Sequence, residues 1–302
     1  GAGSGKTRVL TRRIAYLLAE RNVAPYEILA ITFTNKAANE MKERVITLVG
    51  NRAKAMWVST FHSACVRILR SEAAALGYSN SFTIYDASDS LRLVTLVMKD
   101  MNLDPKRYNS RAIAGLISDA KNELIGPADF VQNVKNQFDE IVAEVYAHYQ
   151  KRLTSANAMD FDDLIGKTVE LLQRHPEIRA KYRSRFKHIL VDEYQDTNSV
   201  QYQISKLLAA VHENICVVGD DAQSIYSFRG ATIENILQFQ KEYEDVKVVK
   251  LEQNYRSTKQ ILNVANQVIS NNKGQIPKEL WTDNGEGEKI RLVRTMTDND
   301  EG

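Results

Sequence analysis

Residues 1–7, GAGSGKT, decide the fold, because they have the composition of a loop that wraps around phosphate groups. Glycines let backbone N–H groups turn inward around phosphates, and a helix that begins at Lys6 directs its positive end toward them. Lys6 would reach the β- and γ-phosphates, and the Thr7 hydroxyl would take a coordination position on Mg²⁺. The apolar residues that follow repeat at helical spacing: Leu10, Ile14, Leu17 and Leu18. We therefore prefer a phosphate loop to the alternative of an ordinary glycine-rich turn before a helix.

A phosphate loop needs a carboxylate for its metal ion, and the stretch HILVDEYQD, residues 188–196, supplies one. Its apolar run predicts a buried strand that ends at Asp192. Asp192 would hold Mg²⁺ through water, and Glu193 beside it could activate the attacking water as a general base. Paired acids at a strand end are often solvated turn residues, but the phosphate loop upstream favours the metal and base roles.

Two later stretches could extend the same site. In ICVVGDDAQSIYSFRGA, residues 215–231, an apolar run is followed by Gln223 and Arg229. The Gln223 amide can both donate and accept hydrogen bonds, which suits the sensing of a γ-phosphate. In LEQNYRSTKQIL, residues 251–262, Tyr255 could stack on a base and Arg256 could neutralise a transferring phosphoryl group. From the residues alone, packing and surface charge explain these side chains equally well.

The spacing of apolar residues predicts an α/β fold with a parallel sheet. Strands are expected at 28–33, 56–60, 187–191, 214–218 and 246–251, and helices at 61–69, 199–211, 231–243 and 257–271. Strands separated by helices imply βαβ units. From about residue 80 to residue 157 strand-like runs become scarce and polar helices dominate. The simplest organisation is an α/β core interrupted by a helical insertion.

Composition narrows the class of protein only slightly. The chain has 302 residues, and 40 Lys and Arg against 38 Asp and Glu give a formal net charge of +2, which neither demands nor excludes a nucleic-acid partner. Cys65 and Cys216 lie far apart and form no motif, which favours a reducing, cytoplasmic compartment. No apolar run approaches the ~18 residues that would span a bilayer, so no membrane association is expected.

Taken in order, the motifs resemble those of one family. GAGSGKT, AITFTNKAANEM, VSTFHSACVRIL, DFDDLI, LVDEYQDTN, VVGDDAQSIYSFRGA and LEQNYRST are similar to the successive motifs of the UvrD/PcrA/Rep-like superfamily 1A DNA helicases. The resemblance covers essentially the whole chain. It implies a P-loop NTPase (RecA-like) motor that uses ATP and Mg²⁺ to move along single-stranded DNA, usually 3′-to-5′. Such motors unwind duplex DNA in repair or replication.

The resemblance also implies a role for individual residues. Glu193 would be the catalytic base, Gln223 the γ-phosphate sensor, Arg256 an arginine finger and Arg229 a phosphate contact near the hydrolysis site. Tyr255 would stack on adenine, and Thr7 and Asp192 would hold Mg²⁺. The nucleotide-binding set is Gly3, Ser4, Gly5, Lys6, Thr7, Arg8 and Tyr255. The implied domains are residues 1–79 and 160–252 for the motor core, 80–159 for the helical insertion and 253–302 for the start of a second motor domain.

A sequence-independent grip on single-stranded DNA needs aromatic faces for bases and hydrogen-bond donors for phosphates. The expected DNA-binding residues are Phe33, Thr34, Asn35, Thr60, His62, Tyr226 and Phe228. Without the resemblance, aromatic residues at strand ends are more often core residues. The expected partners are single-stranded DNA, junctions of single- and double-stranded DNA, and unidentified repair or replication proteins.

The family's glutamine motif would precede residue 1, and the second motor domain would continue beyond residue 302. We therefore expect the intact protein to be the helicase, and these residues alone to hydrolyse ATP poorly. Two alternatives stay open at this point. One is the motor part of a RecB/AddA-like helicase-nuclease, and the other is a non-hydrolysing scaffold that binds single-stranded DNA.

Many relatives carry Trp where this chain has Phe228, and a phenyl ring offers a smaller stacking surface. Replacing Phe228 by Ala should therefore weaken single-stranded DNA binding, because base–aromatic stacking contributes about 1–3 kcal/mol per base. Titration of a labelled oligonucleotide and DNA-stimulated ATPase measure the effect. Unchanged affinity and unchanged stimulation in Phe228→Ala would show that the stacking assignment is wrong.

Overall fold

The computed structural model describes residues 1–226, 231–243 and 245–291, and its centre is a four-stranded sheet. The strands are β1 (Ile28–Ile31), β2 (Trp57–Ser59), β5 (His188–Val191) and β6 (Ile215–Val217), in the order β2-β1-β5-β6. Every pairing between neighbours is parallel, which confirms the predicted α/β class. The carboxyl ends of all four strands therefore lie along the same edge of the sheet.

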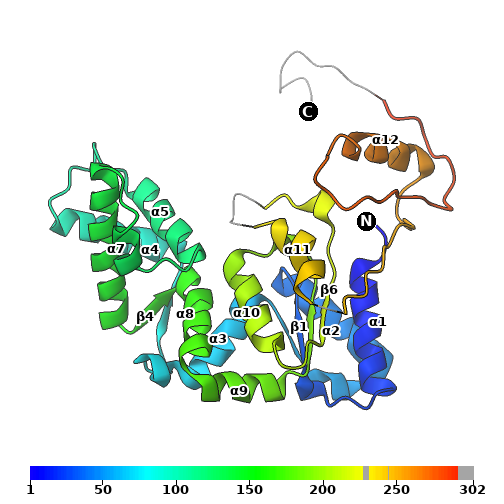
Figure 1. Ribbon diagram of the computed structural model, residues 1–302, viewed down its shortest axis with the longest axis horizontal. Coiled ribbons are helices and arrows are strands. Elements are labelled where there is room, and N and C mark those ends of the chain that lie inside the picture. The colour runs from blue at the N-terminus through cyan, green and yellow to red at the C-terminus, as the bar shows by residue number, and fades with distance from the viewer. Residues whose placement is uncertain (227–230, 244, 292–302) are drawn as a thin grey trace.

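Helices cover both faces of this sheet (Figure 1). Side chains of β1 alternate between the two faces, so Ile28 and Ala30 pack in one hydrophobic cluster while Leu29 and Ile31 pack in the other. The first cluster includes residues of α1 (Lys6–Ala19) and α2 (Asn35–Val49). The second includes residues of α3 (Phe61–Glu72), α8 (Phe161–Arg174), α9 (Pro176–Arg185) and α10 (Ser199–Ala209). The strands are thus buried on both sides.

The helical insertion forms a lobe with its own hydrophobic cluster, seen at the left of Figure 1. Its helices are α4 (Ala87–Asp100), α5 (Ser110–Asn122), α6 (Pro127–Val131) and α7 (Gln137–Ser155). At its base β3 (Thr83–Tyr85) pairs in parallel with β4 (Ala158–Asp160), a two-stranded sheet that the sequence did not predict. Strands of three residues are too short to show a period of two.

The predicted strand at 246–251 is wrong, because none of these residues belongs to a strand in the structure. Val248 and Val249 are exposed there, at 49% and 66% of their surface. β-branched residues fit a sheet, but a strand also needs a neighbour for its backbone groups. The flanking helices form close to their predicted positions, as α11 (Glu234–Glu242) and α12 (Lys259–Ile269).

A buried ionic cluster joins the insertion to the core. The Lys121 ammonium of α5 lies 2.6 Å from Asp160 Oδ2 and 3.0 Å from Asp163 Oδ1, and the Tyr149 hydroxyl donates to Asp160 Oδ2 at 2.7 Å. Burial acts to lower the pKa of Lys121, but the two carboxylates outweigh it and raise that pKa. Lys121 therefore keeps its charge, and the cluster fixes α5 against the start of α8.

Replacing Lys121 by Met should cost about 3–5 kcal/mol of unfolding free energy, because two buried carboxylates lose their cation. Lys259→Met is the matched control, since Lys259 forms an exposed ion pair with Glu286 at 3.3 Å. Exposed pairs of this kind contribute about 0–1 kcal/mol. Urea unfolding followed by circular dichroism compares the two variants, and equal losses would contradict the prediction.

Candidate nucleotide and nucleic-acid site

The phosphate loop closes directly onto α1. Gly5 has φ 82°, a left-handed conformation that glycine adopts at little cost, and α1 begins at the next residue. Lys6 is buried, with 9% of its surface exposed. The Thr7 hydroxyl donates to Asp192 Oδ2 at 2.8 Å. The loop and the end of β5 are therefore in direct contact, as the sequence predicts.

Asp192 and Glu193 follow the last residue of β5. Asp192 is 5% exposed; burial raises its pKa and the charge of Glu193 raises it further, while the Thr7 hydrogen bond acts to lower it. Glu193 has φ 49°, which is uncommon for a residue other than glycine and often marks a functional site. Its backbone N–H donates to Asp192 Oδ1 at 3.0 Å. Glu193 thus stands in a left-handed turn immediately after the strand, with its backbone tied to the Asp192 side chain.

A glutamine connects Glu193 to the end of β6. The Gln195 amide donates to Glu193 Oε2 at 2.8 Å, and its oxygen accepts from the backbone N–H of Asp220 at 2.9 Å. The Gln223 amide donates to Asp220 Oδ2, and Lys6 Nζ lies 3.9 Å from the same oxygen. The sequence predicted Gln223, but it assigned no role to Gln195 or Asp220. In the sequence, the one feature that could have indicated these two residues is their position shortly after the end of an apolar run.

Residues 254–257 dock on the phosphate loop through one buried side chain. Asn254 is 2% exposed, and its amide donates to the carbonyl oxygen of Ala2 at 2.7 Å. Its oxygen accepts from the backbone N–H groups of Arg256 and Ser257 at 2.8 and 2.7 Å. The Tyr255 N–H donates to the carbonyl oxygen of Gly3 at 3.0 Å, while its ring is exposed. The backbone of Tyr255 and the Cβ of Arg256 therefore lie beside the loop.

Two of the predicted DNA-binding aromatic residues form a pair. The ring centroids of Phe33 and Tyr226 lie 4.8 Å apart, with 37° between the ring planes. Phe33 is 37% exposed, so it is not the core residue that its position at a strand end first suggested. The pair presents two adjacent rings at the surface. Phe228 lies outside the residues that the structure describes, as does Arg229.

The predicted polar DNA contacts lie where two helices begin. The Thr34 hydroxyl accepts from the Ala37 N–H at 3.1 Å and caps α2, and the Thr60 hydroxyl accepts from the Ser63 N–H at 3.3 Å and caps α3. Thr60 also donates to Asn35 Oδ1 at 3.5 Å, so the two helix starts are adjacent. Helix N-termini attract phosphate groups.

His62 is the second residue of α3, next to this contact, and has a different environment. Its ring lies edge-on to Phe161, with 5.8 Å between centroids. Burial lowers its pKa, so the imidazole is neutral at pH 7. A neutral imidazole contributes no charge to phosphate binding.

Arg8, which the sequence predicts in the nucleotide-binding set, is exposed on the first turn of α1.

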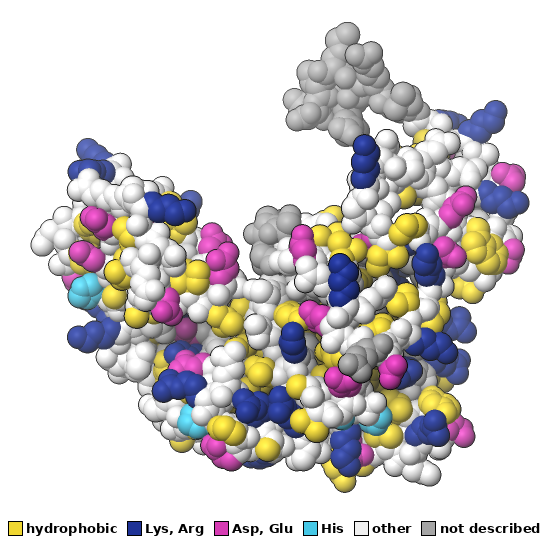
Figure 2. All heavy atoms as spheres, viewed as in Figure 1, with side chains coloured by type: hydrophobic (Ala, Val, Ile, Leu, Met, Phe, Trp, Pro, Cys, Tyr) yellow, Lys and Arg dark blue, Asp and Glu magenta, His cyan; other side chains and the backbone are white. Residues whose placement is uncertain are grey.

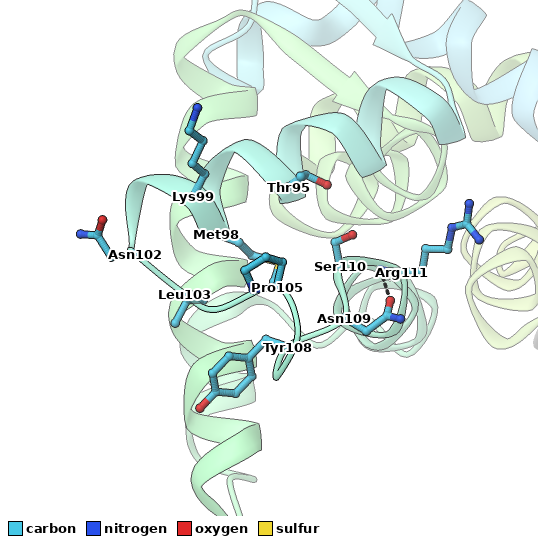
Figure 3. A pocket seen from close by; sticks show the side chains of 10 residues that line it. All are labelled: Thr95, Met98, Lys99, Asn102, Leu103, Pro105, Tyr108, Asn109, Ser110 and Arg111. Atoms are coloured by element: carbon cyan, nitrogen blue, oxygen red, sulfur yellow. Dashed lines mark hydrogen bonds between the residues drawn. The ribbon is translucent and has the colours of Figure 1, made fainter.

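Neither the distribution of basic side chains nor the cavity on the insertion coincides with this site. Figure 2 shows lysine and arginine side chains spread over both lobes rather than gathered in one stripe. A cavity of about 620 Å³ lies on the insertion, between the end of α4 and the start of α5, and Lys99 and Arg111 point outward from it (Figure 3). None of the predicted site residues lines it. No helix among the described residues is long and apolar enough to cross a membrane.

Comparison with known proteins shows the family. The family model described as UvrD/REP helicase N-terminal domain matches residues 1–244, and the model of the UvrD-like helicase C-terminal domain matches residues 249–302. The chain therefore belongs to the UvrD/REP helicase family, and its α/β core is a P-loop NTPase fold. Both conclusions agree with the order of motifs and with the parallel sheet.

Curated relatives are similar along the whole chain. The chain is 54% identical to the ATP-dependent DNA helicase PcrA of Staphylococcus aureus and 54% identical to that of Bacillus subtilis, in each case over 100% of the chain. It is 56% identical to the ATP-dependent DNA helicase UvrD1 of Mycobacterium bovis over 99% of the chain. The chain spans 41%, 41% and 40% of the lengths of these three proteins.

The contact between Gly3 and residues 254–256 can be tested by adding one methyl group. Gly3 has φ 63°, and a Cβ there would lie 2.7 Å from Asn254 Nδ2 and 2.9 Å from Arg256 Cβ. Gly77→Ala is the matched control, because Gly77 has φ 81° and ψ 12° in the left-handed region but nothing within 4 Å of its Cβ position. Both variants carry the backbone strain of about 1–2 kcal/mol, and only Gly3→Ala also displaces the docked segment.

Thermal unfolding and limited proteolysis after residue 256 compare these two variants. We expect Gly3→Ala to melt lower than Gly77→Ala and to be cleaved faster in the C-terminal region. Identical melting and cleavage would show that residues 254–256 do not depend on the phosphate loop.

Proposed function

We propose that the whole protein is an ATP-dependent DNA helicase that moves on single-stranded DNA and unwinds duplex. The observation that carries the proposal is the contact between the phosphate loop and β5, where Thr7 meets Asp192 at 2.8 Å. The names of the relatives, which are ATP-dependent DNA helicases, support it further. In this proposal Lys6 and the N-terminus of α1 bind the nucleotide phosphates.

We assign the metal role to Thr7 and Asp192. A hydroxyl and a carboxylate are hard oxygen ligands, and Mg²⁺ is usually held by one or two carboxylates together with substrate phosphates. Burial raises the pKa of Asp192, so a nearby cation would stabilise its charged form. When bound, Mg²⁺ would neutralise charge on the β- and γ-phosphates. Among the described residues no group of three or more acidic, His or Cys side chains forms a separate metal site.

The remaining roles follow from what each side chain can do. Glu193 accepts the proton of the attacking water, and Gln195 holds one of its two carboxylate oxygens in place. Gln223 reports the presence of the γ-phosphate through its amide. Tyr255 stacks on adenine, and Arg256 and Arg229 stabilise charge on the transferring phosphoryl group.

The DNA strand is proposed to cross the edge of the sheet where α2 and α3 begin. Phe33 and Tyr226 provide stacking faces, with Phe228 following in the sequence. Thr34, Asn35 and Thr60 contact phosphates at the two helix starts. His62, near the start of α3, is proposed to donate one hydrogen bond to the strand, which its neutral imidazole can still do. Binding should weaken as salt rises, because each neutralised phosphate releases counterions.

The proposal also covers the direction of movement, the cellular role, the location and the division into domains. We infer 3′-to-5′ polarity, a role in DNA repair or replication, and a cytoplasmic location. Free Cys65 and Cys216 fit a reducing compartment. We also propose the division into residues 1–79, 80–159, 160–252 and 253–302. The separate hydrophobic cluster of the insertion supports the second of these units.

Two substitutions in the whole protein separate binding from catalysis. Lys6→Ala should lose nucleotide binding, because Lys6 is the buried cation at the start of α1 that would reach the β- and γ-phosphates. Glu193→Gln should still bind nucleotide but lose about 10²–10⁴-fold in turnover, because the general base is gone. Nucleotide titration and ATPase assays with and without single-stranded DNA measure both. Glu43→Gln, on the exposed side of α2, is the control and should behave like the unaltered protein.

Unwinding of substrates with 3′ or 5′ tails then tests polarity. A Lys6→Ala protein that loses ATPase activity but keeps its complete biological activity would refute the proposal and favour a non-hydrolysing scaffold. Unwinding only from 5′ tails would overturn the polarity alone.

A further inference from the structure

A lysine that is distant from the phosphate loop in the sequence contacts two buried carboxylates just after β6. Lys278 Nζ lies 2.5 Å from Asp220 Oδ1 and also contacts Asp221 Oδ1. The backbone N–H of Ile276 donates to Asp221 Oδ2 at 2.6 Å. Lys278 lies in the region that matches the C-terminal helicase model, and both aspartates lie in the region that matches the N-terminal one. The contact therefore crosses from one helicase domain to the other.

Asp220, Asp221 and Lys278 are shielded from water, so their charges must be balanced within the protein. The side chains of Asp220 and Asp221 are each 2% exposed, and that of Lys278 is 14% exposed. Burial acts to raise the pKa of Asp220, but the ammonium of Lys278 outweighs it and holds that pKa below its ordinary value. A buried carboxylate without a cation is costly. Lys278 thus keeps Asp220 ionised in the interior.

Asp220 connects this lysine to the nucleotide site. Lys278 binds its Oδ1, while Oδ2 accepts from the Gln223 amide and lies 3.9 Å from Lys6 Nζ. The two lysines therefore flank one carboxylate. Because Lys278 holds Oδ1 of Asp220, it also fixes the direction in which Oδ2 points. Oδ2 accepts the hydrogen bond that orients the amide of Gln223.

The backbone on either side of Lys278 is also anchored next to the phosphate loop. The N–H of Trp281 donates to the carbonyl oxygen of Glu252 at 3.1 Å, and the N–H of Asn254 donates to that of Trp281 at 2.7 Å. The Thr282 hydroxyl donates to the carbonyl oxygen of Asn254 at 2.7 Å. Asn254 is the residue that docks on the loop at Ala2. The segment 276–282 thus connects the loop to the end of β6.

We propose that Lys278 is a positioning residue of the nucleotide site, which holds Asp220 so that Gln223 is correctly oriented and neutralises the Asp220–Asp221 pair so that triphosphate can enter. This inference rests on the proposed nucleotide-hydrolysing function. Without Lys278, the Asp220 carboxylate beside Lys6 would lose its nearest cation, and the negative charge around it would rise with Asp221 next in sequence. Asp220 would then compete with phosphate for the Lys6 ammonium, and Gln223 would lose its fixed acceptor.

The test is Lys278→Met in the whole protein, with binding of a fluorescent ATP analogue and DNA-stimulated ATPase as readouts. We expect nucleotide affinity to fall about tenfold, and kcat to fall about 10–100-fold, the range seen when a reacting group is displaced by about 1 Å. Lys250→Met is the matched control. Lys250 donates to the carbonyl oxygen of Pro277 at 2.7 Å, so it contacts the same segment but neither carboxylate, and its loss should leave both readouts unchanged.

Charge compensation distinguishes this role from a merely structural one. Adding Asp221→Asn to Lys278→Met removes one negative charge and leaves an oxygen that can still accept from Ile276. Nucleotide affinity should then recover while kcat stays low, because Asp220 is still not held. Lys278→Arg should keep affinity within about threefold but lower kcat, since its planar fork cannot reproduce the ammonium geometry. Melting temperatures of all variants check that they fold.

Unchanged affinity and kcat in a folded Lys278→Met protein would overturn the inference. Equal losses in Lys278→Met and Lys250→Met would also overturn it, as would no recovery of affinity on adding Asp221→Asn. If Lys278→Met does not fold, Lys278→Arg provides the test. A lowered kcat with nearly unchanged affinity supports the inference, and equal changes in the two overturn it. The proposed function fails separately, if the unaltered protein neither binds nor hydrolyses ATP.

Discussion

The hydrogen bond from Thr7 to Asp192 joins the start of α1 to the carboxyl end of β5, and the rest of the site is arranged around this contact. It is possible because parallel strands all end at one edge of the sheet, where the helix starts also lie. A residue placed just after any of these strands is therefore carried to the same edge. This is why Phe33, Asp192 and Asp220, which lie far apart in the sequence, belong to one surface.

Buried charges determine how the outer parts attach to this core. Lys121 joins the insertion to α8, and Lys278 joins the C-terminal segment to the end of β6. In both places one ammonium is shared by two aspartates. A shift of either segment would leave carboxylates buried without a cation, which costs about 3–5 kcal/mol. Such pairs therefore act together with the surrounding hydrophobic packing to hold each segment in place.

The sequence predicts the parts of the fold that depend on local pattern. The phosphate loop, four of the five predicted strands and the helices beside them form where apolar spacing places them. The strand at 246–251 does not form, because pairing depends on a neighbour and not on β-branched residues alone. Of the site, the sequence indicates side chains with recognisable chemistry, such as Lys6 and Glu193. It cannot indicate Gln195, Asn254 or Lys278, whose importance comes only from contacts made by folding.

Gln195 shows why such supporting residues matter to the proposed chemistry. Its amide donates to Glu193 at one end and accepts from the Asp220 N–H at the other, so its orientation is fixed by both partners. A carboxylate in its place could not donate, and it would set a like charge against the base. The left-handed backbone of Glu193 needs such support, because strain of this kind persists only where the surroundings enforce it. Through Gln195, the position of the base and that of Asp220, which orients Gln223, are determined together.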